Sequence, residues 1–238
     1  AAYPKTLSGK TVATYVNTHT DLSDELYREG KLVSDNYKNI LRSQTNAAAI
    51  PAEVTVRYGV TVRRANLRNL PTGEGLFFYA GDRNFDALQE TALDPGEAVA
   101  ILHTSTNGYF YYVQAYNYRG WLSKFDVAET DRSTWLRYAE PKNFLTVVAK
   151  DYTLKADGAQ VLFQQGARLQ LADKKASAYT VKVPVRTKEG KLQEEKVVLA
   201  ANASLHEGYL PYTTNNIIRS AFKFYDSVYG WGGLQQSV

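Results

Sequence analysis

The sequence predicts a mainly β protein with helical segments near its two ends. Three observations support this fold class. Apolar residues recur every three or four positions in the first fifty residues, a spacing typical of amphipathic helices. From about residue 54 apolar and polar residues alternate, which is the period of β-strands. Helical spacing returns after residue 209.

The first fifty residues are predicted to form a small helical cap. Asp21 and Ser23 are residues that favour helix starts, Gly30 predicts a break, and Pro51 ends the segment. The apolar residues at helical spacing are Leu22, Leu26, Tyr27, Val33, Tyr37, Ile40 and Leu41.

The next segment is predicted to form a small β-barrel. Val54, Val56, Tyr58 and Val60 fall on one face of a strand. Three further β-rich runs follow, with an Asn-Gly turn at residues 106–108 of the kind that tight hairpins favour. A long irregular loop over residues 69–97 separates the first run from the others.

A second β-rich stretch follows Pro141, with four or five predicted strands and a hairpin turn at residues 187–190. An amphipathic helix is predicted after residue 209, with Thr213 or Thr214 as its N-cap. Its apolar face consists of Ile217, Ile218, Ala221, Phe222 and Tyr225. A glycine-rich run, Tyr-Gly-Trp-Gly-Gly, follows at residues 229–233.

Composition excludes several classes of protein. A hydrophobic fraction of 44% and a charged fraction of 22% are those of an ordinary globular protein, and no stretch approaches the length of a membrane span. The net charge of +4 comes without a long basic run, which favours a solvated surface over a nucleic-acid partner. The 18 tyrosines suit either wet binding surfaces or plain β-sheets.

The residues themselves predict no catalytic constellation. The chain has no Cys, which excludes thiol catalysis and thiolate metal sites within it. His19, His103 and His206 lie far apart in sequence and are predicted to be structural. Neither a metal nor a cofactor is predicted, because no ligand spacing or phosphate loop is present.

Four stretches resemble the N-terminal part of NlpC/P60 cysteine peptidases that carry bacterial SH3-like domains. They are RYGVTVRRANLRNLPT at residues 57–72, LHTSTNGYFYYVQAYNYRGWL at 102–122, GYLPYTTNNIIRSAFKFYDSVYGWGG at 208–233 and, more weakly, the helical cap. The resemblance implies four regions: a cap at 1–53, SH3-like barrels at 54–140 and 141–208, and the first helix of a papain-like α+β peptidase domain at 209–238.

The resemblance also implies a chemistry. In that family the glycine-rich run leads to Asp-Cys-Ser, in which the Cys is the nucleophile, and this chain stops at Val238, just before that point. The parent protein is therefore expected to hydrolyse the γ-D-glutamyl–diamino-acid bond of peptidoglycan stem peptides, whereas this chain alone cannot. The expected partners are stem peptides and the remainder of the peptidase domain.

Four residues carry the expected site. Tyr229 matches the family tyrosine that positions substrate or stabilises an oxyanion. Tyr118, Trp231 and Arg68 are assigned to substrate binding, and packing is the alternative for Tyr118 and Trp231. Arg63 and Arg64 share the alternatives of Arg68, which are a stem-peptide carboxylate or a plain charged surface. Trp121 is expected in the core.

Two other functions stay open. One is a non-catalytic cell-wall-binding or adaptor module, against which stands the apolar surface that Phe222 and Phe224 would expose. The other is an SH3-like module for proline-rich peptides. The opening Ala-Ala-Tyr-Pro suits a mature N-terminus after removal of a signal peptide, or a cut made elsewhere, and the expected location is secreted or in the cell envelope.

Overall fold

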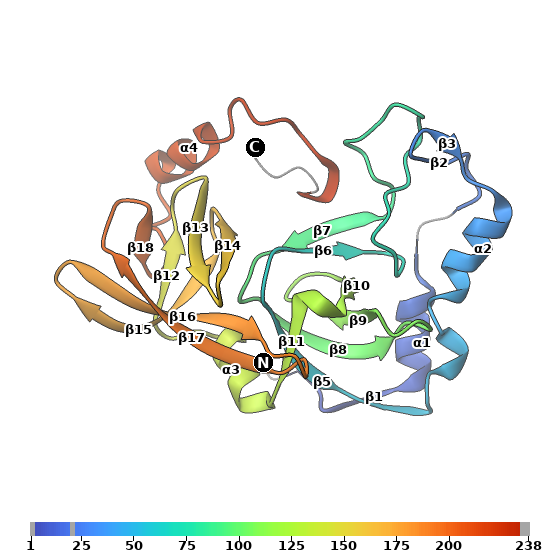
Figure 1. Ribbon diagram of the computed structural model, residues 1–238, viewed down its shortest axis with the longest axis horizontal. Coiled ribbons are helices and arrows are strands. Elements are labelled where there is room, and N and C mark those ends of the chain that lie inside the picture. Colours follow the sequence, from blue (N-terminus) through green and yellow to red (C-terminus); the bar gives the residue numbers. More distant parts are fainter. Residues whose placement is uncertain (1–2, 20–21, 234–238) are drawn as a thin grey trace.

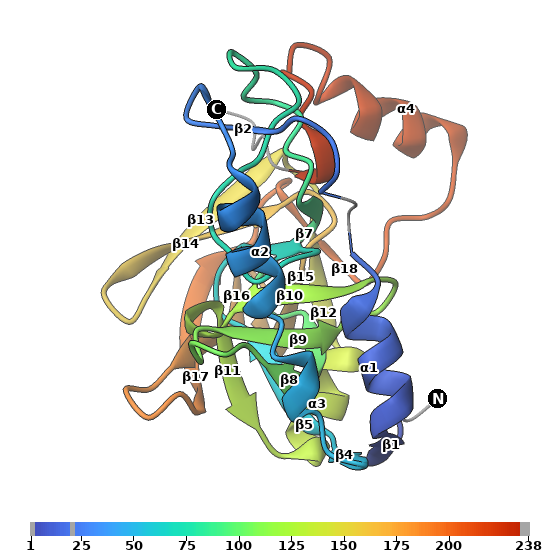
Figure 2. The same ribbon diagram turned by 90° about the vertical axis from the view of Figure 1, so that its right-hand side faces the viewer.

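The computed structural model describes residues 3–19 and 22–233. Two β units lie side by side (Figure 1), and an N-terminal segment of short helices packs along the outer side of the first unit, where α1 and α2 face the viewer in Figure 2. The C-terminal segment lies over the second unit as a helix and then runs back to the first unit. The protein is mainly β, as the sequence predicts.

The N-terminal segment is only partly helical, which corrects the expectation of a helical cap. It contains β1 (Thr6–Ser8), α1 (Gly9–Asn17), β2 (Tyr27–Arg28), β3 (Lys31–Leu32), α2 (Asp35–Ser43) and the 3-10 helix η1 (Ala47–Ala49). Gly30 lies in the hairpin turn between β2 and β3 with a φ of +78°, so it makes a turn instead of a helix break. Asp21, one predicted helix start, lies outside the described residues.

Leu22, Leu26 and Val33 are buried although residues 22–33 form no helix. Leu22 and Leu26 are 1% and 0% exposed and pack in one cluster with Leu70, Leu76 and Leu88 of the long loop. Apolar residues recur at helical spacing in this segment because they are buried against the long loop, and not because the segment is a helix. Ser8 and Ser34 cap α1 and α2, since their hydroxyls accept from the Thr11 and Tyr37 backbone N–H groups.

The first β unit is a seven-stranded antiparallel sheet in the order β11-β5-β8-β9-β10-β6-β7. The strands are β5 (Arg57–Thr61), β6 (Ala65–Arg68), β7 (Gln89–Leu93), β8 (Ala98–Thr104), β9 (Phe110–Gln114), β10 (Arg119–Ser123) and β11 (Val127–Thr130). β4 (Glu53–Thr55) pairs with β1 instead, and η2 (Lys124–Asp126) precedes β11. Trp121 is fully buried, as predicted.

One predicted connection of this unit is confirmed, and the irregular loop predicted over residues 69–97 is corrected, because β7 forms within it. The turn at residues 105–109 joins β8 to β9, and Gly108 there has a φ of +71°. The long loop spans residues 69–88 between β6 and β7. Helix α3 (Arg132–Ala139), which the sequence reading missed, follows β11, with Asp131 as its N-cap and Trp135 and Tyr138 buried. At eight residues with a single apolar face, α3 has too little length to be separated from a strand by its periodicity.

The second β unit has more strands than the four or five predicted. A five-stranded sheet has the order β17-β16-β15-β12-β18, and β13 and β14 form a separate hairpin over it. The strands are β12 (Phe144–Val147), β13 (Asp151–Ala156), β14 (Ala159–Gln164), β15 (Arg168–Lys175), β16 (Ala178–Arg186), β17 (Leu192–Ala200) and β18 (Leu205–Glu207). The predicted turn at residues 187–190 joins β16 to β17, with Gly190 at a φ of +84°.

The C-terminal segment contains α4 (Thr214–Phe222) and the 3-10 helix η3 (Trp231–Gly233). Thr213 caps α4 through its hydroxyl, which accepts from the Asn216 N–H, as one of the two predicted N-caps. No residue of α4 is buried, and Phe222 is 68% exposed. Among the described residues, no helix has the length and apolar character needed to cross a membrane.

One prediction arises from the contact between α1 and the first β unit. The hydroxyl of Tyr112, on β9, donates to the Tyr15 carbonyl over 2.9 Å. Burial raises the pKa of Tyr112 to about 12, so the folded state favours the neutral phenol. The unfolded chain ionises first as the pH rises past 10, and unfolding becomes easier by up to about 3 kcal/mol between pH 10 and 12.

Replacing this tyrosine should remove that alkaline loss. We expect Tyr112→Phe to be less stable than the wild type by about 1 kcal/mol at pH 8, because one hydrogen bond is lost, and more stable than it near pH 12. Urea unfolding at the two pH values measures both differences. Tyr116→Phe, at a 95% exposed position, is the control. If wild type and Tyr112→Phe lose the same free energy of unfolding between pH 8 and pH 12, the alkaline loss does not come from Tyr112.

Candidate functional site

The candidate site lies where the long loop of residues 69–88 meets the turn of residues 229–233. Two of the predicted site residues come together here. The Trp231 N–H donates to the Asn84 carbonyl over 2.8 Å, and the Tyr229 ring lies 5.9 Å from the ring of Phe85. The long loop of the first β unit thus contacts a segment that lies more than 140 positions further along the chain.

Two side chains hold the carbonyl groups of the glycine turn. Gln89 Nε2 donates to the Gly232 carbonyl, and an Arg64 guanidinium N–H donates to the Gly233 carbonyl, each over 3.2 Å. Gly232 has a φ of +57°, and a Cβ atom there would lie 2.8 Å from the Gln89 side chain. Glycine is therefore required at this position by both its conformation and its close approach to β7.

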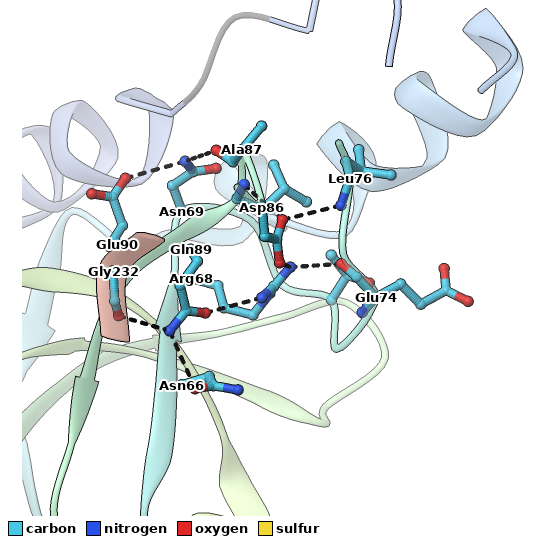
Figure 3. Close-up of polar contacts among 12 residues, drawn as sticks. Asn66, Arg68, Asn69, Glu74, Leu76, Asp86, Ala87, Gln89, Glu90 and Gly232 are labelled. Carbon is cyan, nitrogen blue, oxygen red and sulfur yellow. Dashed lines mark hydrogen bonds and ion pairs between the residues drawn. The ribbon is translucent and has the colours of Figure 1, made fainter. Parts of the chain in front are cut away.

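Behind this turn, Arg68 is the centre of a buried polar network (Figure 3). Its guanidinium pairs with Asp86 at 2.8 Å and donates to Gln89 Oε1 at 3.1 Å and to the Glu74 carbonyl at 2.6 Å. Arg68 is 3% exposed and Asp86 is 1% exposed. Asp86 also accepts from the Leu76 and Leu88 backbone N–H groups, both over 3.0 Å.

The position of Arg68 corrects its predicted role as a direct substrate ligand. A guanidinium at 3% exposure, engaged by a carboxylate, an amide and a carbonyl, offers no open face to a carboxylate from solution. Arg68 instead fixes both ends of the long loop and orients Gln89 toward Gly232. Arg64 is also paired, with Asp94 at 3.4 Å, whereas the Arg63–Asp126 pair is at the surface.

A pocket of about 300 Å³ opens beside the glycine turn. Its walls are the aromatic residues Phe78, Tyr79, Phe85 and Trp231, together with Asp82, Asp86 and Ala87. Tyr79 is 74% exposed and Trp231 is 50% exposed, so their ring faces are available to a ligand. Pockets with apolar walls and a few fixed polar groups suit small ligands or single side chains of a peptide.

Tyr118, the other predicted substrate contact, does not line this pocket. It lies in the turn before β10 and is 42% exposed. Its carbonyl accepts from the Ala115 N–H over 2.8 Å and from Gln114 Nε2 over 3.0 Å. The structure therefore brings Tyr229 and Trp231 together and places Tyr118 in the turn between β9 and β10, outside the lining of this pocket.

The loop residues of the pocket were missed by the sequence reading. The stretch LFFYAGDRNF at residues 76–85 holds four aromatic residues in an irregular, glycine-containing loop. A loop of this kind has little core in which to bury aromatics, so some must face solvent or a ligand. That concentration was the available signal for Phe78, Tyr79 and Phe85.

The N-terminal segment supports the other side of the loop. The Tyr37 hydroxyl and the Arg28 guanidinium both donate to the Glu74 carboxylate, with Arg28 at 2.9 Å. The Tyr37 bond, followed by that of Arg28, holds the pKa of Glu74 below its ordinary value. Tyr27 pairs with Phe77 of the loop through two backbone hydrogen bonds.

The three histidines are distributed over separate parts of the fold. His103 Nε2 lies 3.0 Å from the Asn46 carbonyl, and burial lowers the pKa of His103. His206 Nδ1 lies 3.3 Å from the Gly208 carbonyl. Across residues 3–19 and 22–233, no three His, Asp or Glu side chains are grouped to hold a metal ion.

Comparison with known families identifies the domain that carries the loop. Residues 76–123 match the SH3 domain of the SH3b1 type. The match runs from the long loop through β10, inside the first β unit. The predicted SH3-like character of this unit is therefore confirmed for those residues. No curated protein sequence matches the chain.

One solved structure reproduces nearly the whole fold. It is described as a novel NlpC/P60 endopeptidase from Photobacterium damselae subsp. piscicida. The similarity has a TM-score of 0.66 at 20% identity and covers 95% of this chain and 58% of that chain. At this identity the likeness shows the fold, and the chain spans somewhat over half the length of the protein it resembles.

Proposed function

We propose that this chain is the substrate-restricting and wall-recognising part of a cysteine endopeptidase. The parent enzyme hydrolyses the γ-D-glutamyl–diamino-acid bond of peptidoglycan stem peptides. The observation that supports this function best is the docking of Tyr229 and Trp231 against the long loop of an SH3b1-type domain. The fold similarity to an NlpC/P60 endopeptidase agrees with it.

In this proposal the nucleophilic Cys and its histidine base lie outside residues 1–238, because the chain itself has no Cys. A thiol at a helix N-terminus has a lowered pKa and attacks as the thiolate. The Tyr229 hydroxyl, on a 65% exposed side chain, donates to the oxyanion formed at the scissile carbonyl. The aromatic pocket holds a small side chain of the stem peptide and limits what enters.

Cleavage of a defined peptide by the full-length protein tests this function. We expect hydrolysis of L-Ala-γ-D-Glu-diaminopimelate. Tyr229→Phe should lower kcat about 100-fold with little change in KM, because one oxyanion donor is lost. Tyr79→Ala should raise KM instead. Tyr212→Phe, at a 95% exposed position outside the pocket, is the control. A full-length protein that cleaves no stem peptide would overturn the proposal.

A second function depends on what covers the exposed face of α4, which is the remainder of the peptidase domain in the leading proposal and a separate partner in an adaptor module. Ile217, Ile218 and Phe222 are 47%, 47% and 68% exposed, which is unusual for a helix of a globular protein. A non-catalytic wall-binding or adaptor module would use this face to bind a partner. The two functions differ in one assay: only the peptidase releases free diaminopimelate from the tripeptide, whereas the adaptor binds wall material and leaves it intact.

The expected location follows from the substrate. Peptidoglycan lies outside the cytoplasmic membrane, so the parent enzyme is proposed to act in the cell envelope or as a secreted protein. Fractionation of cells that express the tagged full-length protein checks this. Recovery only in the cytoplasmic fraction would place its substrate among released peptides instead.

A further inference from the structure

A groove of about 640 Å³ lies where the two β units meet, away from the aromatic pocket. The end of β7, the turn before β10, the linker after α3 and the turn before β15 all contribute to its walls. The volume falls within the range of about 300–1,000 Å³ typical of ligand sites. Its polar and aromatic side chains include Asp94, Glu97, Asn117, Arg168, Tyr116 and Tyr209.

Two carboxylates in the groove are held by cations. Asp94 Oδ1 accepts from the Gln164 N–H over 3.0 Å and pairs with Arg64 at 3.4 Å. Glu97 Oε2 pairs with Arg168 at 3.5 Å. Their side chains are 18% and 26% exposed, and burial raises the pKa of both. Asp94 and Glu97 thus each have an arginine partner, which offsets the cost of their burial, and Glu140 is a third carboxylate in the lining of the groove.

The second oxygen of each carboxylate is available to a ligand. Within residues 3–19 and 22–233, Asp94 Oδ2 and Glu97 Oε1 have no hydrogen-bond partner, and neither is fully buried. These oxygens are strong acceptors whose negative charge is already balanced. They therefore favour a neutral O–H or N–H donor over an ammonium group. Arg168 and Asn117 supply donors in the same groove.

Two tyrosine rings complete the groove. Tyr116 is 95% exposed and Tyr209 is 68% exposed. The Tyr209 ring is fixed in place by an edge contact with Phe144, with 4.8 Å between ring centroids. A flat aromatic face packs against the C–H face of a ring that also carries hydroxyl groups at its rim.

We propose that the groove between the two β units is a saccharide-binding site. Sugar hydroxyls donate to the carboxylate oxygens of Asp94 and Glu97 and accept from Arg168 and Asn117, since a hydroxyl does both. The sugar ring packs on Tyr116. That the natural sugar is the glycan strand of the cell wall rests on the proposed function, whereas saccharide binding by the groove does not.

An extended peptide is the main competitor for this groove, because β7 is the edge strand of its sheet and edges bind peptides by adding a strand. That edge is already covered by the glycine turn. Gly232 lies against Gln89 and Gly233 lies against Ala92. The groups left to a ligand are side chains, and their balance of donors and acceptors matches hydroxyls better than a peptide backbone.

Titration of the 238-residue chain with chitotetraose, a neutral oligosaccharide, tests the site. We expect saturable binding at about millimolar concentration and a loss of about tenfold in affinity in Tyr116→Ala. Tyr212→Ala is the matched control, since Tyr212 is also 95% exposed and does not line the groove. Tyr79→Ala, in the aromatic pocket, should bind the sugar like wild type. Glu97→Gln, which keeps an acceptor, should bind more tightly than Glu97→Ala.

Each outcome decides between alternatives. No binding of chitotetraose, or equal affinity in wild type and Tyr116→Ala, overturns the saccharide site. If Tyr116→Ala instead weakens binding of the stem tripeptide, the groove is a peptide site and the proposal is wrong. A full-length protein that cleaves no stem peptide while the chain still binds sugar through Tyr116 defeats the proposed peptidase but leaves the saccharide site standing.

Discussion

Arg68→Met is expected to lower the free energy of unfolding by about 3–5 kcal/mol, because it leaves Asp86 as a buried carboxylate without its cation. The pair is almost wholly buried, with side chains 4% and 1% exposed. The loop should also loosen, since Arg68 bonds to Gln89 and to the Glu74 carbonyl. Urea unfolding measures the stability, and iodide quenching of Trp231 measures the loosening.

A second variant and a control keep this result interpretable. Arg68→Met/Asp86→Asn removes both charges but keeps an oxygen acceptor for the Leu76 and Leu88 N–H groups, and it should recover about half of the loss or more. Arg63→Met breaks a pair in which Arg63 is 64% exposed and should cost less than about 1 kcal/mol. Equal losses in Arg63→Met and Arg68→Met would contradict the role assigned to the buried pair.

Trp121→Ala is expected to cost about 3–5 kcal/mol, because it removes a large, fully buried ring and leaves a cavity. Trp121 lies on β10 with its ring edge against Tyr112, 5.2 Å between centroids, and 6.3 Å from the His103 ring. It also pairs with Arg68 across β10 and β6. The substitution should therefore weaken the strand that supports the buried network.

Trp121→Phe should cost far less, about 1 kcal/mol, for two reasons. The cavity is smaller, and the indole N–H, which is buried without a hydrogen-bond partner, is removed at the same time. Trp231→Ala, at a half-exposed position, is the control of the same residue type and should cost less than about 1 kcal/mol. Unfolding followed by circular dichroism avoids the loss of the fluorescent reporter. If Trp121→Ala and Trp231→Ala lower the free energy of unfolding by similar amounts, the assignment of Trp121 to the core is wrong.

The sequence predicts the structure best where local chemistry determines local structure. The Asn-Gly turn at 106–108, the turn at 187–190 and the Thr213 cap of α4 are all present, since each depends on backbone conformation or on one side-chain oxygen. The period-two spacing from residue 54 correctly placed β4 and β5. These features need no information from distant parts of the chain.

The sequence does not predict the structure where long-range packing overrides the local spacing of apolar residues. Leu22 and Leu26 have helical spacing, yet they are buried against Leu70, Leu76 and Leu88 of the long loop, so the segment has no reason to become a helix. In the sequence, Arg68 can be recognised only as a cation in a β-rich run. Its carboxylate partner lies 18 positions away on the far end of a loop, and no local pattern reveals such a pair.

The sequence by itself determined the mainly β class, the turns, the capped C-terminal helix and the absence of a thiol from the chain, because these follow from residue type and spacing. Only the tertiary structure decided which aromatic residues form the pocket with Trp231, and that Tyr118 stands apart from it. It alone brought Asp94 and Arg168 into one groove between the two β units. The physical reason is that these residues are far apart in the sequence. The distances between them in space depend on strand order and packing, which the spacing of residue types along the chain does not encode.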